Sequence, residues 1–112
     1  MIDAEWTADL EMSLRIYEMQ IANQLLHIRI DQARDIVRQA LAVLRGRVQT
    51  LPVVLQMTPA AVCLADSIET LPTDLAIHTA RTHQELREQL LKIYRTEKIF
   101  LERMKLIAHG IF

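Results

Sequence analysis

The chain has 112 residues, of which 51% are hydrophobic and 24% are charged, and this composition is typical of one globular domain rather than a disordered segment. Thirteen basic and fourteen acidic side chains leave a formal charge of −1, so no overall field attracts nucleic acid or an anionic membrane. Two glycines, three prolines and 4% aromatic residues favour helices. We therefore expect an all-α protein whose partners are neither nucleic acid nor membrane.

The first long segment, at about 4–48, carries two apolar stripes on nearly opposite faces if it forms one continuous helix, because each residue advances the helix by about 100°. The first stripe consists of Leu10, Leu14, Tyr17, Ile21, Leu25 and Ile28. The second stripe consists of Met12, Ile16, Met19, Leu26, Ile30, Ala33, Val37, Leu41, Leu44 and Val48. A helix that is apolar on two sides needs neighbours on both sides. The segment therefore predicts two packing partners.

The rest of the single domain, which spans residues 1–112, is expected to contain a connector at 49–58, a short helix at about 59–69 and a second long helix at about 74–109. Thr58 and Pro59 form a helix-start signal, with a hydroxyl group at the N-cap and proline at the first helical position. Pro72 ends the short helix, because the residue before a proline avoids the helical region. Either Thr73 or Asp74 then caps the last helix.

Two long helices joined by a short one are expected to form an elongated antiparallel hairpin. The last helix covers the first stripe, and a second copy of the chain, or another helical protein, covers the second. A homodimer then completes a four-helix bundle. The predicted interface residues are Met12, Ile16, Met19, Leu26, Ile30, Val37, Leu41 and Leu44. The mostly apolar segment 51–64 is expected either to cap the end of the hairpin or to dock a partner.

The cysteine content and the N-terminal sequence predict a cytoplasmic location. Cys63 is the only cysteine, which excludes a disulfide within the chain and favours a reducing compartment. The first five residues, from Met1 to Glu5, lack the basic and apolar regions of a signal peptide.

Sequence motifs for catalysis or metal binding are absent. The chain has no glycine-rich phosphate loop, no Cys-x-x-Cys, no Glu-x-x-His and no His-x-x-x-His. His78 and His83 are five residues apart, so on one helix they diverge by about 140° and do not share a metal ion. We therefore predict no catalytic residue, no metal ion and no cofactor.

Glu97 is the ionisable residue that interrupts the apolar face of the last helix. In the expected hairpin it lies within reach of His27 or Arg29, and a buried carboxylate needs such a partner or stays protonated. Three interpretations remain open. Glu97 is an edge residue whose carboxylate reaches water, a member of a buried ion pair with Arg29 or His27 that fixes the helix register, or a catalytic acid or base.

The sequence favours a non-enzymatic interaction protein, such as an adaptor, a regulator or a secretion-chaperone-like subunit. The alternative is a small helical enzyme, because the outline of long, short and long helices is similar to that of the all-helical chorismate mutases. That resemblance implies an anionic substrate held by several cations. Candidate cations on the first helix are Arg15, Arg29, Arg34 and Arg38. No Lys or Arg lies between Arg47 and Arg81, which disfavours this alternative.

Overall fold

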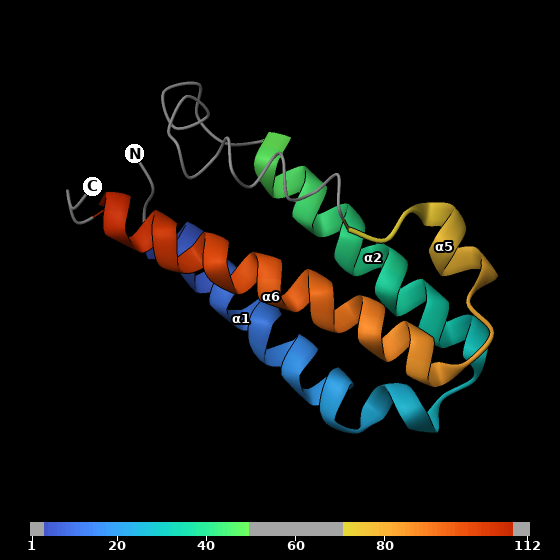
Figure 1. The fold of residues 1–112 in the computed structure, drawn as a ribbon. Coiled ribbons are helices and arrows are strands. Elements are labelled where there is room, and N and C mark those ends of the chain that lie inside the picture. Colours follow the sequence, from blue (N-terminus) through green and yellow to red (C-terminus); the bar gives the residue numbers. More distant parts are fainter. Residues whose placement is uncertain (1–3, 50–70, 109–112) are drawn as a thin grey trace.

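The N-terminal segment consists of two α-helices and a short 3-10 helix rather than one continuous helix. In the computed structural model, which describes residues 4–49 and 71–108, helix α1 (Ala4–Ala22) is followed by the 3-10 helix η1 (Gln24–His27) and by α2 (Ile30–Gln49). Asn23 and Ile28, on either side of η1, leave the helical region, and Ile28 is extended with φ −110° and ψ 170°. The expected continuous helix at 4–48 is therefore wrong, because the chain reverses between Ala22 and Ile30 (Figure 1).

The two apolar stripes give the physical reason for this reversal. The buried residues of α1 are Leu10, Leu14, Tyr17 and Ile21. The buried residues of α2 are Ala33, Val37, Ala40, Leu41 and Leu44. In a straight helix the two sets lie on opposite sides, and only one of them can face the chain's own core. The reversal turns both sets towards the same core, which buries more apolar surface within one chain.

The second long helix is also divided, into α5 (Asp74–Thr79) and α6 (His83–Ala108). Of the two caps that the sequence allows for the first of these, the structure uses Thr73, whose Oγ1 accepts a hydrogen bond from the Ala76 N–H at 3.1 Å. A second start signal follows, in which the Oγ1 of Thr82 accepts from the Glu85 N–H, also at 3.1 Å. The expected single helix at 74–109 is therefore interrupted at residues 80–82.

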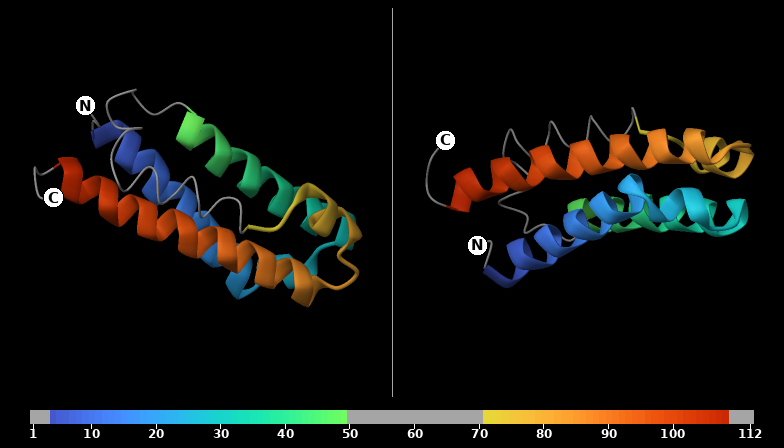
Figure 2. Two further views of the ribbon diagram at one scale, coloured as in Figure 1. Left: turned by 45° about the horizontal axis from the view of Figure 1, so that its top comes forward. Right: turned by 90° about the horizontal axis from the view of Figure 1, so that it is seen from below.

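The helices form two layers, with α6 in one and α1, η1 and α2 in the other (Figure 2). Helix α6 packs against both α1 and α2, and α5 packs against α2. The described residues are helical or lie in the turns between helices, and none of them forms a strand. The longest dimension is 43 Å and the radius of gyration is 14.5 Å. Apart from Gln49, the expected connector at 49–58, the short helix at 59–69 and the apolar segment 51–64 lie outside the described residues.

Side chains from distant parts of the chain hold the reversal after α1 and the break between α5 and α6 by binding carbonyl groups at helix ends. Arg87 Nε of α6 donates a hydrogen bond to Ile21 O at 2.8 Å, and His83 Nε2 lies 2.7 Å from Ile28 O. Because a carbonyl oxygen only accepts, the Nε2 of His83 carries the proton. Arg34 of α2 donates twice to Ala80 O, at 3.1 and 2.7 Å. Carbonyl groups at helix ends lack partners within the helix, so these bonds satisfy otherwise unpaired acceptors.

Removing the Arg87 guanidinium tests whether it holds the reversal after α1. We expect Arg87→Met, which keeps the apolar stem, to lower the free energy of unfolding by about 1.5–3 kcal/mol, because a part-buried acceptor loses a charged donor. Arg95→Met on the exposed side of the same helix is the matched control and should change it by under about 0.5 kcal/mol. Urea unfolding measures both, and equal stability of the two variants contradicts the assignment.

Candidate functional site

The predicted interface residues separate into an exposed set on α1 and η1 and a more buried set on α2. Met12, Ile16, Met19 and Leu26 are exposed, with fractions of 63%, 47%, 59% and 43%. Ile30 is half-buried against the core. Val37, Leu41 and Leu44 have no exposed surface, so their assignment to an interface between chains is wrong. The reversal has turned this part of the second stripe inwards, where it packs within the chain.

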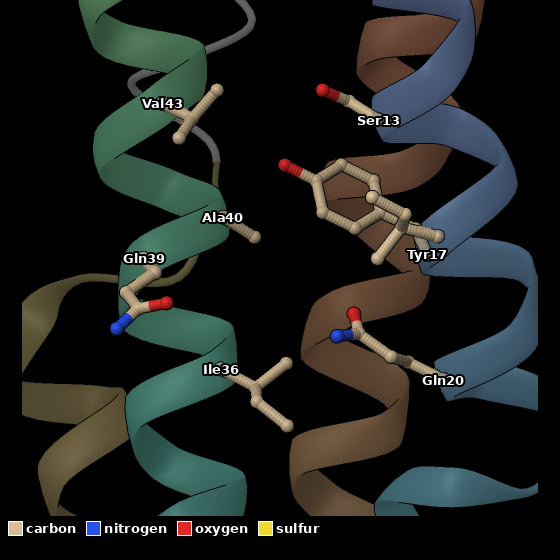
Figure 3. A pocket seen from close by; sticks show the side chains of 8 residues that line it. Ser13, Tyr17, Gln20, Ile36, Gln39, Ala40 and Val43 are labelled. Atoms are coloured by element: carbon tan, nitrogen blue, oxygen red, sulfur yellow. The ribbon is translucent and has the colours of Figure 1, made fainter.

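A groove of about 200 Å³ lies between α1 and α2, and we call it the α1–α2 groove. Its walls are Ser13, Ile16, Tyr17 and Gln20 from α1 and Ile36, Gln39, Ala40 and Val43 from α2. None of the eight carries a formal charge at neutral pH. Figure 3 shows the hydroxyl groups of Ser13 and Tyr17 directed towards α2, with Ala40 and Val43 on the opposite wall. The groove is therefore an uncharged, largely apolar surface with a few polar groups.

Three exposed apolar side chains of α1 form a ridge beside this groove. Met12, Ile16 and Met19 are spaced by four and three residues, which places them along one side of the helix, and Ile16 also lines the groove. We call these three residues the α1 ridge. Two glutamates lie on another side of α1 and contact α6. Glu18 accepts a hydrogen bond from Tyr94 Oη at 2.6 Å, and Glu11 pairs with Lys105, whose contact lowers the pKa of this carboxyl group. These two carboxylates of α1 are thus directed to α6 and do not line the groove.

Glu97 lies in the core with no exposed surface, which rules out the interpretation that its carboxylate reaches water at an edge. Its neighbouring cation is Arg47, whose Nε lies 4.0 Å from Glu97 Oε1. The expected pairing with Arg29 or His27 is wrong, because Arg29 is exposed beside Asp31 and His27 is exposed in η1. The expected pairing of two long helices placed the turn of the chain after residue 48. The chain instead reverses between Ala22 and Ile30, which brings the C-terminal end of α2 alongside Glu97.

The surroundings of Glu97 favour its neutral form. Neither carboxylate oxygen has a hydrogen-bond partner among the described residues. Burial raises the pKa of Glu97 to about 7, and the positive charge of Arg47 opposes this rise. Burial also raises the pKa of Tyr17, and the negative charge of Glu97 adds to that effect. Because no surface of Glu97 is accessible, a substrate cannot touch it, and its role as a catalytic acid or base is unsupported.

Three of the four cations proposed for the enzyme alternative contact groups within the chain, and the fourth, Arg15, is exposed on α1. Arg29 contacts Asp31, Arg34 binds the carbonyl group of Ala80, and Arg38 binds Asp35. In the described ranges, no group of three His, Cys, Asp or Glu side chains is arranged to hold a metal ion. No helix within 4–49 or 71–108 combines the length and the apolarity needed to cross a lipid bilayer.

Comparisons of the chain with protein-family models, with curated proteins and with solved structures gave no match.

The division of the second stripe predicts opposite effects of substitution on its two parts. We expect Leu41→Ala to lower the free energy of unfolding by about 2–5 kcal/mol, because it leaves a cavity in the core. Met19→Ala should lower it by under about 0.5 kcal/mol, because this side chain is mostly exposed. Thermal and chemical unfolding measure both effects. A neutral Leu41→Ala that weakens self-association instead would return Leu41 to an interface between chains.

Proposed function

We propose that the protein is a non-enzymatic interaction protein that binds a second copy of itself, or another helical protein, through the α1 ridge and the α1–α2 groove. The observation that carries this proposal is the exposure of Met12, Ile16 and Met19 beside an uncharged groove. Single exposed apolar residues are common on soluble proteins, but a contiguous row next to a groove is typical of a binding surface. A helix that offers apolar side chains at three- and four-residue spacing fits such a groove.

A second copy fits this surface because the ridge and the groove lie side by side on one face. Two copies related by a two-fold axis can each place the ridge in the groove of the other, and this reciprocity is what a symmetric dimer requires. The uncharged lining supports the same arrangement, since symmetry would otherwise bring like charges together. The α1 and α2 helices of both copies would then surround one apolar seam as a four-helix bundle, with α6 outside on each side.

A protein of this design would act by holding other polypeptides, as an adaptor, a regulator or a secretion-chaperone-like subunit. The choice among these roles is an analogy based on fold. The single cysteine supports a reducing, cytoplasmic setting. The near-zero formal charge argues against nucleic acid as the partner.

Ile16→Glu tests the proposal, because it places a charge where the ridge meets the groove. Light scattering at micromolar concentration should give about twice the 12.9 kDa chain mass for the parent protein and the single-chain mass for the variant. Ile99→Glu is the matched control, since Ile99 is also an isoleucine, is 52% exposed and lies on α6 in the other layer. It should leave the mass unchanged.

The unfolding midpoint separates loss of assembly from loss of folding in these variants. Both glutamate variants should remain helical by circular dichroism. A parent protein with the single-chain mass contradicts self-association. If another helical protein then binds it, and Ile16→Glu abolishes that binding while Ile99→Glu does not, the surface is assigned correctly and the partner is a different chain.

A further inference from the structure

Polar groups from three helices meet at one point of an otherwise apolar core. Glu97 comes from α6, Arg47 from α2, and Ser13 and Tyr17 from α1. Among the described residues, Glu97 is the charged residue that is completely buried, and the Arg47 side chain is only 14% exposed. Removing a carboxylate from water is costly unless it is paired and hydrogen-bonded, so this cluster is an energetically expensive feature of the core.

Arg47 connects the carboxyl group of Glu97 to a wall of the α1–α2 groove. Its Nε lies 4.0 Å from Glu97 Oε1, and its Nη2 donates a hydrogen bond to Ser13 Oγ at 2.7 Å. Ser13 and Tyr17 both line the groove. The guanidinium group of Arg47 therefore contacts the groove wall through its Nη2 and approaches the buried carboxyl group of Glu97 through its Nε.

Within the described parts of the chain, the electrostatics of Glu97 involve one residue from α2 and one from α1. Arg47 faces it from α2 and Tyr17 faces it from α1, and each interacts with it electrostatically. On α6 itself, the neighbouring Lys98 is exposed, with its Nζ over the ring of Tyr94 at 5.9 Å. Within this cluster of described residues, Glu97 is therefore a group whose charge changes near neutral pH.

The geometry matches the protonated state of Glu97 better than the ionised state. An ionised, buried carboxylate requires close donors, whereas 4.0 Å exceeds hydrogen-bond distance. A neutral carboxyl group tolerates this separation and leaves Arg47 bonded to Ser13. Burial raises the pKa of Glu97 to about 7, so both states are populated near neutral pH.

We propose that Glu97 is a proton-dependent switch for the α1–α2 groove. With a proton on its carboxyl group, Arg47 binds Ser13 and fixes the groove wall. When the proton is released to solvent, the guanidinium group moves to the carboxylate and gives up Ser13. This inference rests on the proposed function of the groove, and it names the regulation of that surface. Self-association that needs the fixed wall is then stronger below pH 7 than above it.

The direction of the pH dependence follows from the higher pKa in the folded chain. The ordinary value for a glutamate carboxyl group is 4.5, and the folded value is about 7. Protonation of Glu97 therefore stabilises the fold fully below pH 4.5, and this contribution is lost as the pH rises through 7. Loss of the proton from Glu97 between pH 5.5 and 7.5 therefore lowers the folding equilibrium constant by about twentyfold.

The first experiment compares unfolding of the parent chain, Glu97→Gln and Glu102→Gln between pH 5.5 and 7.5. The parent and Glu102→Gln, an exposed control on α6, should both show the loss in stability. Glu97→Gln should lack it, because a neutral amide replaces the titrating group. The four histidines are present in all three proteins, so their contribution cancels in the comparison. Parallel profiles for the parent and Glu97→Gln overturn the proposal.

The second experiment follows the carboxyl carbon of Glu97 and the side-chain signals of Ser13 by nuclear magnetic resonance during the same titration. Both should move with one midpoint near pH 7, and the Ser13 signals should stay constant in Glu97→Gln. Ser13 signals that remain fixed while Glu97 titrates overturn the switch. These readouts do not require a dimer, so they separate failure of the switch from failure of the proposed function. Where the dimer forms, an unchanged dissociation constant between pH 6 and pH 8 also overturns the switch.

Discussion

The reversal between Ala22 and Ile30 is the constraint on which the rest of the structure depends. It turns the apolar stripes of α1 and α2 towards one core, so that α6 can cover both helices. It also brings the C-terminal end of α2 next to α1, which creates the groove and places Arg47 between Ser13 and Glu97. The exposed ridge is what remains of the second stripe after α2 has turned inwards. The packing of the core, the α1–α2 groove and the burial of Glu97 beside Arg47 thus all follow from this reversal.

The sequence indicated the helical class and the unusual position of Glu97, and it offered Thr73 as one of two caps for α5. It did not indicate the reversal, because residues 23–29 contain neither proline nor glycine. The hydrogen bonds that hold the reversal come from His83 and Arg87, which lie far along the chain, so the sequence around the reversal does not predict them. The break before α6 did have a local signal, since Thr82 and Glu85 have the spacing of a capping box. The partner of Glu97 was missed because the register depends on where the chain turns.

Helix α1 has different chemistry on the sides that meet α6 and α2. The side facing α6 joins apolar packing to two polar contacts, made by Glu11 and Glu18. The α1 side chains that line the groove towards α2 carry no charge, and packing there is less complete, which leaves the groove. This asymmetry explains how one short helix contributes both to a stable core and to an accessible apolar surface. Helix α1 packs against α6 on the first side, which leaves part of the other side accessible.

The two hydrogen bonds that hold the reversal span 55 and 66 residues of the chain. On the ribosome, α1 and α2 are therefore synthesised well before the side chains that hold them in place. Until α6 emerges, the apolar stripes of α1 and α2 lack the helix that covers them, and the nascent chain exposes hydrophobic surface that is prone to aggregation. Closing contacts of such long sequence separation is also slow compared with helix formation. The packing of α1 and α2 is consequently completed only after α6 has been made.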